Sequence, residues 1–203
     1  MPLGKTNLIF NDEVRCPSFP YEAEFIPAVT VQRNANGTVK QSLVHDPHDW
    51  MRFTINLGQL TAAQKDAVIE FFMVVGGNID SFLFRDEYGF GNVVARHTFY
   101  TAVGGETTLQ AARIFSVGSE SRSYELWNFE SYGLWKNGSP WAPAVDSSDS
   151  GAIGPFTALA PGDVIEGQFS VLRRVRFTGG WKNVLRSYEL NDISLVLAEE
   201  GVE

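Results

Sequence analysis

Hydrophobic and polar residues alternate along much of the N-terminal part of the chain, a pattern typical of β-strands with one buried face. The clearest run is WMRFTINL at 50–57, whose apolar side chains share one face: Met51, Phe53, Ile55 and Leu57. Upstream, the alternating segments AVTVQR and TVKQSLVH flank NANG at 34–37, which is a turn signal. We predict a hairpin followed by a half-buried strand.

The period becomes helical after residue 60. Thr61 and Gln64 have the spacing of a capping box, in which each side chain accepts the other residue's backbone N–H. Two glycines at 76–77 can supply the positive φ of a helix C-cap. Between these signals the apolar residues recur at helical spacing: Ala67, Val68, Phe71, Phe72 and Val75. We predict one helix at about 62–75, with its two phenylalanines packed on a sheet.

Two further strands are predicted by alternation. In IDSFLFRD at 79–86, Phe82 and Phe84 share one face and Leu83 lies on the other, so both faces are expected to be covered. In FSVLRRVRF at 169–177, the apolar residues of one parity are Phe169, Val171, Val175 and Phe177. The arginines of this stretch, at 173, 174 and 176, are interpreted as exposed positions of the strand, in preference to a phosphate-binding patch.

The last strand, SYELNDISLVLA at 187–198, changes parity between Leu190 and Ile193. A strand that switches faces needs an extra residue, which predicts a β-bulge at Asn191–Asp192.

Residues 92–167 differ from the rest of the chain, because they combine many Gly, Ser and Pro residues with short apolar pieces. LWKNGSPW contains an Asn-Gly turn between two short strands, DSSDSGAIG is typical of a loop, and ALAPGDVIEGQFSV is a Pro-Gly turn that leads into a strand. We predict a mainly β, α+β protein with one helix, in which a small all-β insertion at 92–167 separates residues 1–91 from residues 168–203.

The charge and the cysteine content of the chain argue against several classes of function. The 203-residue chain has 24 acidic and 16 basic residues, a formal net charge of −8, which disfavours specific binding to nucleic acid. Its single cysteine, Cys16, excludes an internal disulfide and any multi-cysteine metal site. There is no run of 18 apolar residues, so no membrane-spanning helix is expected.

Candidate catalytic chemistry is sparse. HDPHDW at 45–50 is the one dense group of possible metal ligands, His45, Asp46, His48 and Asp49. Its proline and its composition favour a polar loop over a metal site. Nucleophile-elbow, P-loop and dinucleotide-binding motifs are all missing from the sequence. We therefore expect a protein that is not an enzyme and holds no cofactor or metal.

Aromatic residues are concentrated in YELWNFESYGLWKNGSPW at 124–141. Three interpretations follow, in order of preference: the core of a small β-domain, a subunit contact, or a platform that stacks sugars. The candidate surface residues are Trp127, Tyr132, Trp135 and Trp141, with Tyr124 beside them.

The order of several motifs carries a resemblance. A Pro-containing start, the hairpin, the capped helix, FLFRD at 82–86, GGETTLQ at 104–110 and the Arg176-Phe177 pair occur in that sequence. Over residues 17–200 the chain resembles the distal tail protein family of long-tailed bacteriophages and gene transfer agents. It departs from the family pattern at Thr178, where an acidic residue is expected, and in its aromatic insertion.

The resemblance implies a structural protein of the virion. Distal tail proteins form six-fold rings that join the tail tube to the hub and baseplate, and their ring domain is a tail-tube-like β-sandwich with one helix. The implied partners are further copies of the chain, the tail tube protein and the hub or baseplate proteins, with DNA passing through unbound. The implied location is the phage tail tip, after synthesis in the host cytoplasm. The alternative is a carbohydrate-binding β-module that uses the aromatic insertion for host attachment.

Three charged residues are candidates for structural contacts. Arg85 and Asp86 end the FLFRD motif where the chain leaves the first domain, and Arg176 marks its return. They are expected either to fix the chain exit by hydrogen bonds, within the subunit or to a neighbour, or to be solvated charges at a strand end. Both interpretations remain open from the sequence.

Overall fold

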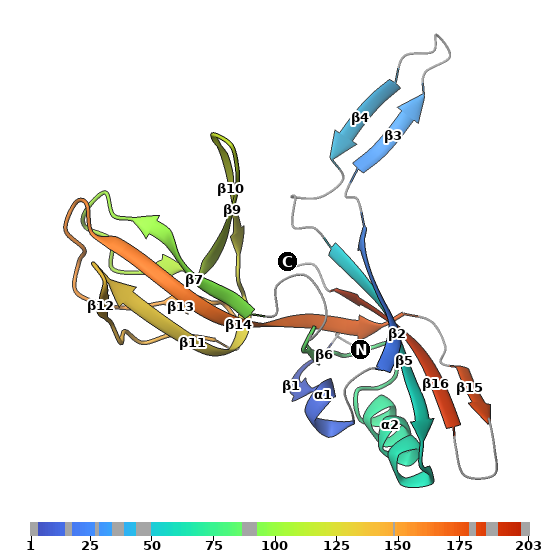
Figure 1. Cartoon of the computed structure of the whole chain (residues 1–203). Helices are drawn as coiled ribbons and strands as arrows, with labels where there is room; N and C mark the ends of the chain where they lie inside the picture. The colour runs from blue at the N-terminus through green and yellow to red at the C-terminus, as the bar shows by residue number, and fades with distance from the viewer. Residues whose placement is uncertain are drawn as a thin grey trace. The chain divides into compact units, whose positions relative to one another are not determined.

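The computed structural model describes residues 4–14, 18–26, 29–33, 39–43, 50–86, 93–147, 149–178, 182–185 and 191–199. Most of these residues lie in β-strands, so the prediction of a mainly β, α+β protein is confirmed (Figure 1). The chain divides into two compact units. We call residues 1–84 and 174–203 the discontinuous unit, and residues 85–173 the inserted unit.

These boundaries differ from the predicted ones at 91/92 and 167/168. The reason is that β14 (Val164–Phe177) begins in the inserted unit, where it pairs with β7 (Val93–Thr101) as far as Ser170 opposite Val93. Phe169 and Val171 of β14 are buried in the core of the inserted unit. The predicted boundary followed a change in composition and ended the insertion at residue 167, whereas residues 168–173 of β14 also belong to the inserted unit.

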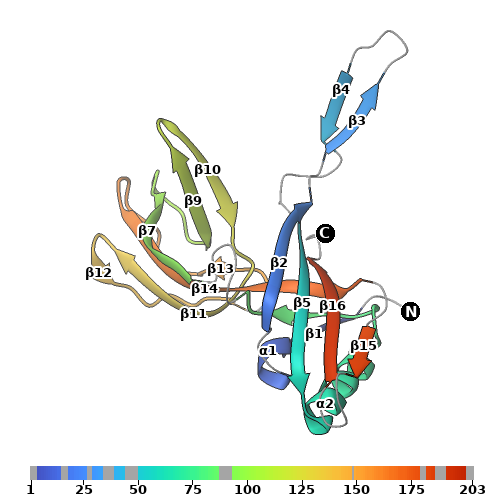
Figure 2. The same cartoon turned by 45° about the vertical axis from the view of Figure 1, so that its right-hand side comes forward.

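The discontinuous unit is built on part of a ten-stranded mixed sheet, along the path β1-β6-β14-β16-β5-β2. β2, β5, β16 and β15 lie side by side in Figure 2. β1 and β6 are parallel, whereas β14 with β16, β16 with β5, β5 with β2, and β15 with β16 are antiparallel pairs. β3 and β4 form the predicted hairpin as a separate two-stranded sheet. The bounds are β1 (Lys5–Ile9), β2 (Ser18–Ile26), β3 (Val29–Arg33), β4 (Val39–Leu43), β5 (Trp50–Leu60), β6 (Ser81–Phe84), β15 (Lys182–Leu185) and β16 (Asn191–Glu199).

The predicted helix is α2 (Ala62–Val74). Its capping box is present: the Thr61 N–H donates to Gln64 Oε1 at 3.0 Å, and the Gln64 N–H donates to Thr61 Oγ1 at 3.3 Å. Gly76 and Gly77 follow with φ of 63° and 71°, the left-handed conformation expected after a helix end. A second helix, α1 (Phe10–Glu13), was not predicted, because a four-residue turn is too short to show a helical period.

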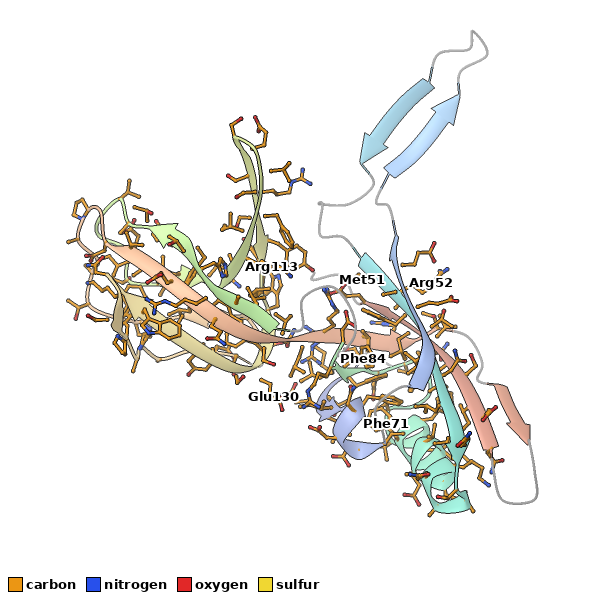
Figure 3. The ribbon with its side chains drawn as sticks, in the orientation of Figure 1. Met51, Arg52, Phe71, Phe84, Arg113 and Glu130 are labelled. Atoms are coloured by element: carbon orange, nitrogen blue, oxygen red, sulfur yellow. The ribbon has the colours of Figure 1, made fainter. Side chains whose placement is uncertain are left out.

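The core of the discontinuous unit is rich in phenylalanine. β5 alternates as predicted, and its four apolar residues at 51, 53, 55 and 57 are all buried. Phe71 is 5% exposed, and its ring meets Phe82 edge-on at 5.1 Å and Phe10 at 5.3 Å (Figure 3). Phe72 is only partly buried, so the expectation that both helix phenylalanines are buried holds for Phe71 alone. Leu83 is buried on the face opposite Phe82, as predicted for a strand covered on both sides.

The bulge lies opposite the predicted position. Between β5 and β16, Leu57 faces Ile193 and Leu60 faces Asn191, so two residues of β5 stand against one of β16. The extra residue belongs to β5, where Gln59 has a φ of 56° and its N–H donates to Asp192 Oδ1 at 2.9 Å. The prediction of an irregular pairing at 191–192 is confirmed. The prediction that β16 carries the extra residue is wrong, because that residue belongs to β5. The proposed parity change involves Leu190, which lies outside the described residues.

The inserted unit has a hydrophobic core of its own, and its longer strands belong to the same ten-stranded sheet through β14. The first part of β14 pairs with β7 on one side and with β11 (Asn128–Lys136) on the other. Two small antiparallel pairs complete the unit, β9 (Ala112–Val117) with β10 (Glu120–Glu125) and β8 (Leu109–Gln110) with β13 (Ala152–Ile153).

Two turns of the inserted unit lie where the sequence predicts them. The predicted Asn-Gly hairpin joins β11 to β12 (Ser139–Pro140), with φ of 50° at Asn137 and 79° at Gly138, as a tight hairpin turn requires. The Pro-Gly pair at 161–162 forms a turn before β14, as predicted. The segment at 146–154, predicted as a loop, contains the two-residue strand β13 within turns.

Candidate functional site

A cluster of four charged residues lies in the inserted unit where the chain enters and leaves it. Arg85 binds Glu130 of β11 through two contacts, Nη2 to Oε1 at 2.7 Å and Nε to Oε2 at 3.0 Å. Asp86 is 1% exposed, and its Oδ2 lies 3.9 Å from Nε of Arg173 on β14, which is 8% exposed. The two ends of the inserted unit are therefore joined by charged side chains from adjoining parts of the chain.

The next arginine along β14 has partners in the discontinuous unit. Arg174 is 8% exposed and donates from Nη1 to the Thr6 carbonyl at 3.0 Å and from Nη2 to Asn7 Oδ1 at 2.9 Å. The interpretation of the arginines at 173 and 174 as exposed strand positions is therefore wrong. Both faces of β14 are covered here, since all five residues at 171–175 are buried. Buried arginines are kept by hydrogen bonds and counter-charges.

The three candidate contact residues thus have different surroundings. Arg85 and Asp86 both interact inside the inserted unit, whereas Arg176 is partly buried in the discontinuous unit and stands opposite Ala198 of β16. The sequence could not show that Glu130 and Arg173 are the partners of Arg85 and Asp86, because they lie 45 and 87 positions further along the chain.

The candidate aromatic surface is not a single surface. Trp135 stands opposite Glu166 on one face of β11. Trp141, which follows β12, packs instead against the core of the inserted unit: its backbone N–H donates to the Leu134 carbonyl, and its ring packs edge-on against Phe156 at 4.9 Å. Tyr132 is 45% exposed and contacts Phe129 edge-on at 5.5 Å, while Nε1 of Trp127 is buried.

Trp135 is also partly covered. The guanidinium carbon of Arg96 lies 4.4 Å from the centroid of its ring, and Arg96 is held there by Glu166 through Nη2 to Oε2 at 2.6 Å. The ring in turn leans over Gly133, where an added Cβ would come within 2.6 Å of it. A sugar that stacked on this face of the indole would have to displace Arg96 from a cation–π contact and a salt bridge.

The GGETTLQ motif forms a tied turn at one end of the inserted unit. The Glu106 carboxylate accepts the N–H groups of Val103 and Gly104, each at 2.9 Å, and the Tyr100 hydroxyl at 2.8 Å. Gly104 has a φ of 109° and lies against Pro161, where a Cβ would come within 2.7 Å of the proline ring. Hydrogen bonding to its own backbone N–H, together with these donors, lowers the pKa of Glu106, and the bond to Glu106 raises the pKa of Tyr100.

A second carboxylate ties the neighbouring turns. Asp163 lies 2.8 Å from Lys136 Nζ and accepts from Asn137 Nδ2 at 2.8 Å and from the Ala160 N–H at 3.0 Å. Lys136 first, then the bonds from Asn137 and Ala160, lower the pKa of Asp163 to about 2. Sequence reasoning missed Glu106 and Asp163 as functional side chains, although both follow glycines in turn motifs, GGE and PGD.

The depressed pKa of Asp163 predicts an acid-sensitive end of the inserted unit. A carboxylate with a lowered folded-state pKa stabilises the fold above its unfolded value of 3.8, and this contribution disappears as the pH falls toward about 2. Asp163→Asn should therefore reduce stability at pH 7 and flatten the loss of stability between those pH values. Denaturant melts over a pH series would measure both effects.

The matched control for this prediction is Asp149→Asn, because Asp149 is an exposed aspartate of the same unit. Its pH profile should follow that of the unchanged protein. A profile for Asp163→Asn that also matches the unchanged protein would contradict the assigned role of the carboxylate.

The described residues contain no group of three or more His, Cys, Asp and Glu side chains arranged to hold a metal ion. The ligand-like segment at 45–49 lies outside them. Within the same described ranges, no helix has the length and apolar character needed to cross a membrane. The charged groups that the structure brings together form ion pairs or accept hydrogen bonds from backbone N–H groups in turns, and both kinds of contact position the backbone.

Comparison with known proteins adds no assignment: no protein-family model and no curated protein sequence matches this chain.

Proposed function

We propose that this chain is a structural virion protein, a distal tail protein that forms a homohexameric ring between the tail tube and the hub or baseplate. In this role it has no catalytic activity and needs no cofactor. It would act at the phage tail tip, after synthesis in the host cytoplasm, and contact further copies of itself, the tail tube protein and the hub or baseplate proteins.

The observation that carries the proposal is that each family-like motif has a structural role: FLFRD lies at the boundary between the two units, and the other two motifs form a turn and a strand end. FLFRD ends β6 and opens the inserted unit, where Arg85 and Asp86 are bound. GGETTLQ forms the turn tied by Glu106. The Arg176-Phe177 pair closes β14 in the discontinuous unit, and Phe177 is 2% exposed in its core. Motifs at such positions suit a scaffold whose function depends on shape.

The charge of the chain supports passage of DNA without binding. A net charge of −8 gives little electrostatic affinity for phosphates, which is appropriate for the wall of a channel through which DNA moves. The alternative, a carbohydrate-binding module, is less well supported. Arg96 covers part of Trp135, and Trp141, which follows β12, packs against the core of the inserted unit beside Phe156, so the aromatic residues do not form one stacking platform.

The proposal predicts six copies in one ring at the tip of a phage-like tail. A peptide tag on the C-terminus of the chain, labelled in purified particles and imaged by electron microscopy, should place the label there. A reconstruction should then give six-fold density for this chain. The control is the same labelling of particles that carry the untagged chain. Label on the head or along the tail shaft, or a copy number other than six per ring, would overturn the proposal.

A further inference from the structure

Exposed large hydrophobic side chains are unevenly distributed over the described residues. Five of the seven lie in two places: Met73, Val74 and Ile79 in and just after the last turn of α2, and Phe115 and Val117 on the β9–β10 hairpin. Met73 and Val74 are 71% and 69% exposed, and Val117 is 84% exposed. Single exposed apolar residues are ordinary, but groups of them mark contact surfaces.

The first group belongs to a stripe on the outward face of α2. Asp66, Glu70 and Val74 follow each other at intervals of four residues, with Met73 beside them, while Val68, Phe71 and Val75 face the core. The Asp66 side chain is 61% exposed and pairs with the adjacent Lys65 at 3.2 Å. We call Asp66, Glu70, Met73, Val74 and Ile79 the helix patch. It is acidic toward the start of α2 and apolar toward its end.

The second group belongs to one face of the β9–β10 ribbon. Phe115 stands opposite Arg122 and Arg113 opposite Tyr124, so these four side chains share a face, and Val117 opposite Glu120 completes it at the tip. The other face carries Ala112 and Ile114, which pack on the core of the inserted unit, and Tyr124 at the base of the first face also packs against that core, so the exposed side chains of the first face lie toward the tip. The Arg113 guanidinium lies 4.5 Å from the Phe115 ring centroid (Figure 3). We call Arg113, Phe115, Val117 and Arg122 the hairpin patch.

The two patches are complementary in charge order and in length. The hairpin patch has Arg113 and Arg122 toward the base of the ribbon and Val117, beside Glu120, at the tip. The helix patch has Glu70 and Asp66, which pairs with Lys65, toward the start of α2 and Val74 toward its end. At 1.5 Å per helical residue, Asp66 to Val74 spans about 12 Å. At 3.4 Å per strand residue, Arg113 to Val117 spans about 14 Å. Asp66 and Glu70 of the helix patch can therefore each meet an arginine of the hairpin patch, while the apolar ends of the two patches cover each other.

We propose that the helix patch of one copy of this chain docks on the hairpin patch of a second copy. The two surfaces differ, so the contact is head-to-tail, and each bound copy leaves one helix patch and one hairpin patch for further copies. Contacts of this kind close into rings or continue as filaments. The proposal rests on the self-association that the proposed function requires, and it assigns the residues that make the contact.

Cross-linking of mixed single-cysteine variants tests the pairing. In a Cys16→Ser background, Val74→Cys mixed with Val117→Cys and treated with a short bis-maleimide should give a linked dimer. Neither variant alone should give that product, because linkage requires both patches from different copies. The matched control is Ser121→Cys, which lies on the opposite face of the same ribbon tip. Equal linkage of Val74→Cys to the control cysteine, or no linkage at either, would overturn the proposal.

Charge reversal gives an independent measurement by sedimentation. Arg113→Glu/Arg122→Glu and Asp66→Lys/Glu70→Lys should each weaken self-association about tenfold or more, because like charges would face each other. An equimolar mixture of the two variants should recover association, because the unchanged helix patch of one variant meets the unchanged hairpin patch of the other, and the two altered patches meet with reversed signs. Unchanged association of both variants would overturn the assigned surfaces and leave the ring proposal standing. A chain that stays monomeric at every concentration would also overturn this inference, whereas the ring proposal is decided on assembled particles.

Discussion

Replacing Phe71 with alanine is expected to lower the free energy of unfolding of the discontinuous unit by about 3–5 kcal/mol. Phe71 is 5% exposed and lies among Phe10, Phe82 and Phe177, with ring centroids 5.1 to 6.4 Å away. Its removal leaves a cavity surrounded by rigid rings, which cannot collapse easily into the space. The edge-on contacts between the rings are lost as well.

The control is Met73→Ala on the same helix. Met73 is 71% exposed, so its replacement should change stability by no more than about 0.5 kcal/mol. Both variants can be compared in denaturant melts followed by circular dichroism at concentrations low enough to keep the chain dissociated. A loss below about 1 kcal/mol for Phe71→Ala would show that α2 does not pack by this face.

The second large effect is expected at Gly151 in the inserted unit. Gly151 has a φ of 65°, and an added Cβ would lie only 1.8 Å from the Leu126 carbonyl oxygen. Three segments meet at this point: the Ala111 N–H donates to the Gly151 carbonyl, and the Gln110 side chain donates to the Leu126 and Ser150 carbonyls. Gly151→Ala therefore requires the backbone to separate, and a loss of about 2–5 kcal/mol is expected from overpacking and positive φ together.

Gly118→Ala separates the two causes. Gly118 has nearly the same φ, 63°, but no atom lies within 4 Å of the position of its Cβ. It should show only the cost of the left-handed conformation, about 1–2 kcal/mol. Hydrogen exchange measured on peptides from 109–153 would locate the weakening. Equal losses in the two variants would mean that the close approach at Leu126 is not maintained in solution.

Features that depend on neighbouring residues could be predicted from the sequence. The capping box of α2, the alternation of β5 and the Asn-Gly turn at 137–138 are set by residues a few positions apart. Each has a local physical cause, such as a side-chain cap, a two-residue period or a positive φ. Their bounds were right to within a few residues.

Features that depend on pairing between distant segments could not be predicted. Arg173 and Arg174 follow a strand pattern that suggests solvent, yet Asp86 and Thr6 are brought to them from 87 and 168 positions away. The sequence shows that residues 124–141 are rich in aromatic side chains, but not which of these side chains share a face of the sheet, because that depends on the register of β11 with β14. Glu106 had a sequence signal, a carboxylate directly after two glycines, but its donors become evident only when the turn is formed.

The continuity of β14 restricts where the chain can vary in length. Phe169 and Val171 belong to one core and Val175 and Phe177 to the other, and all four have the same parity along one strand. Inserting or deleting a single residue between Val171 and Val175 would turn one pair of side chains out of its core. The β9–β10 turn at 118–119 bears no such constraint, since the residues around it are exposed. Length polymorphism among descendants of this gene should therefore accumulate at that turn, while β14 keeps a fixed residue count between its two halves.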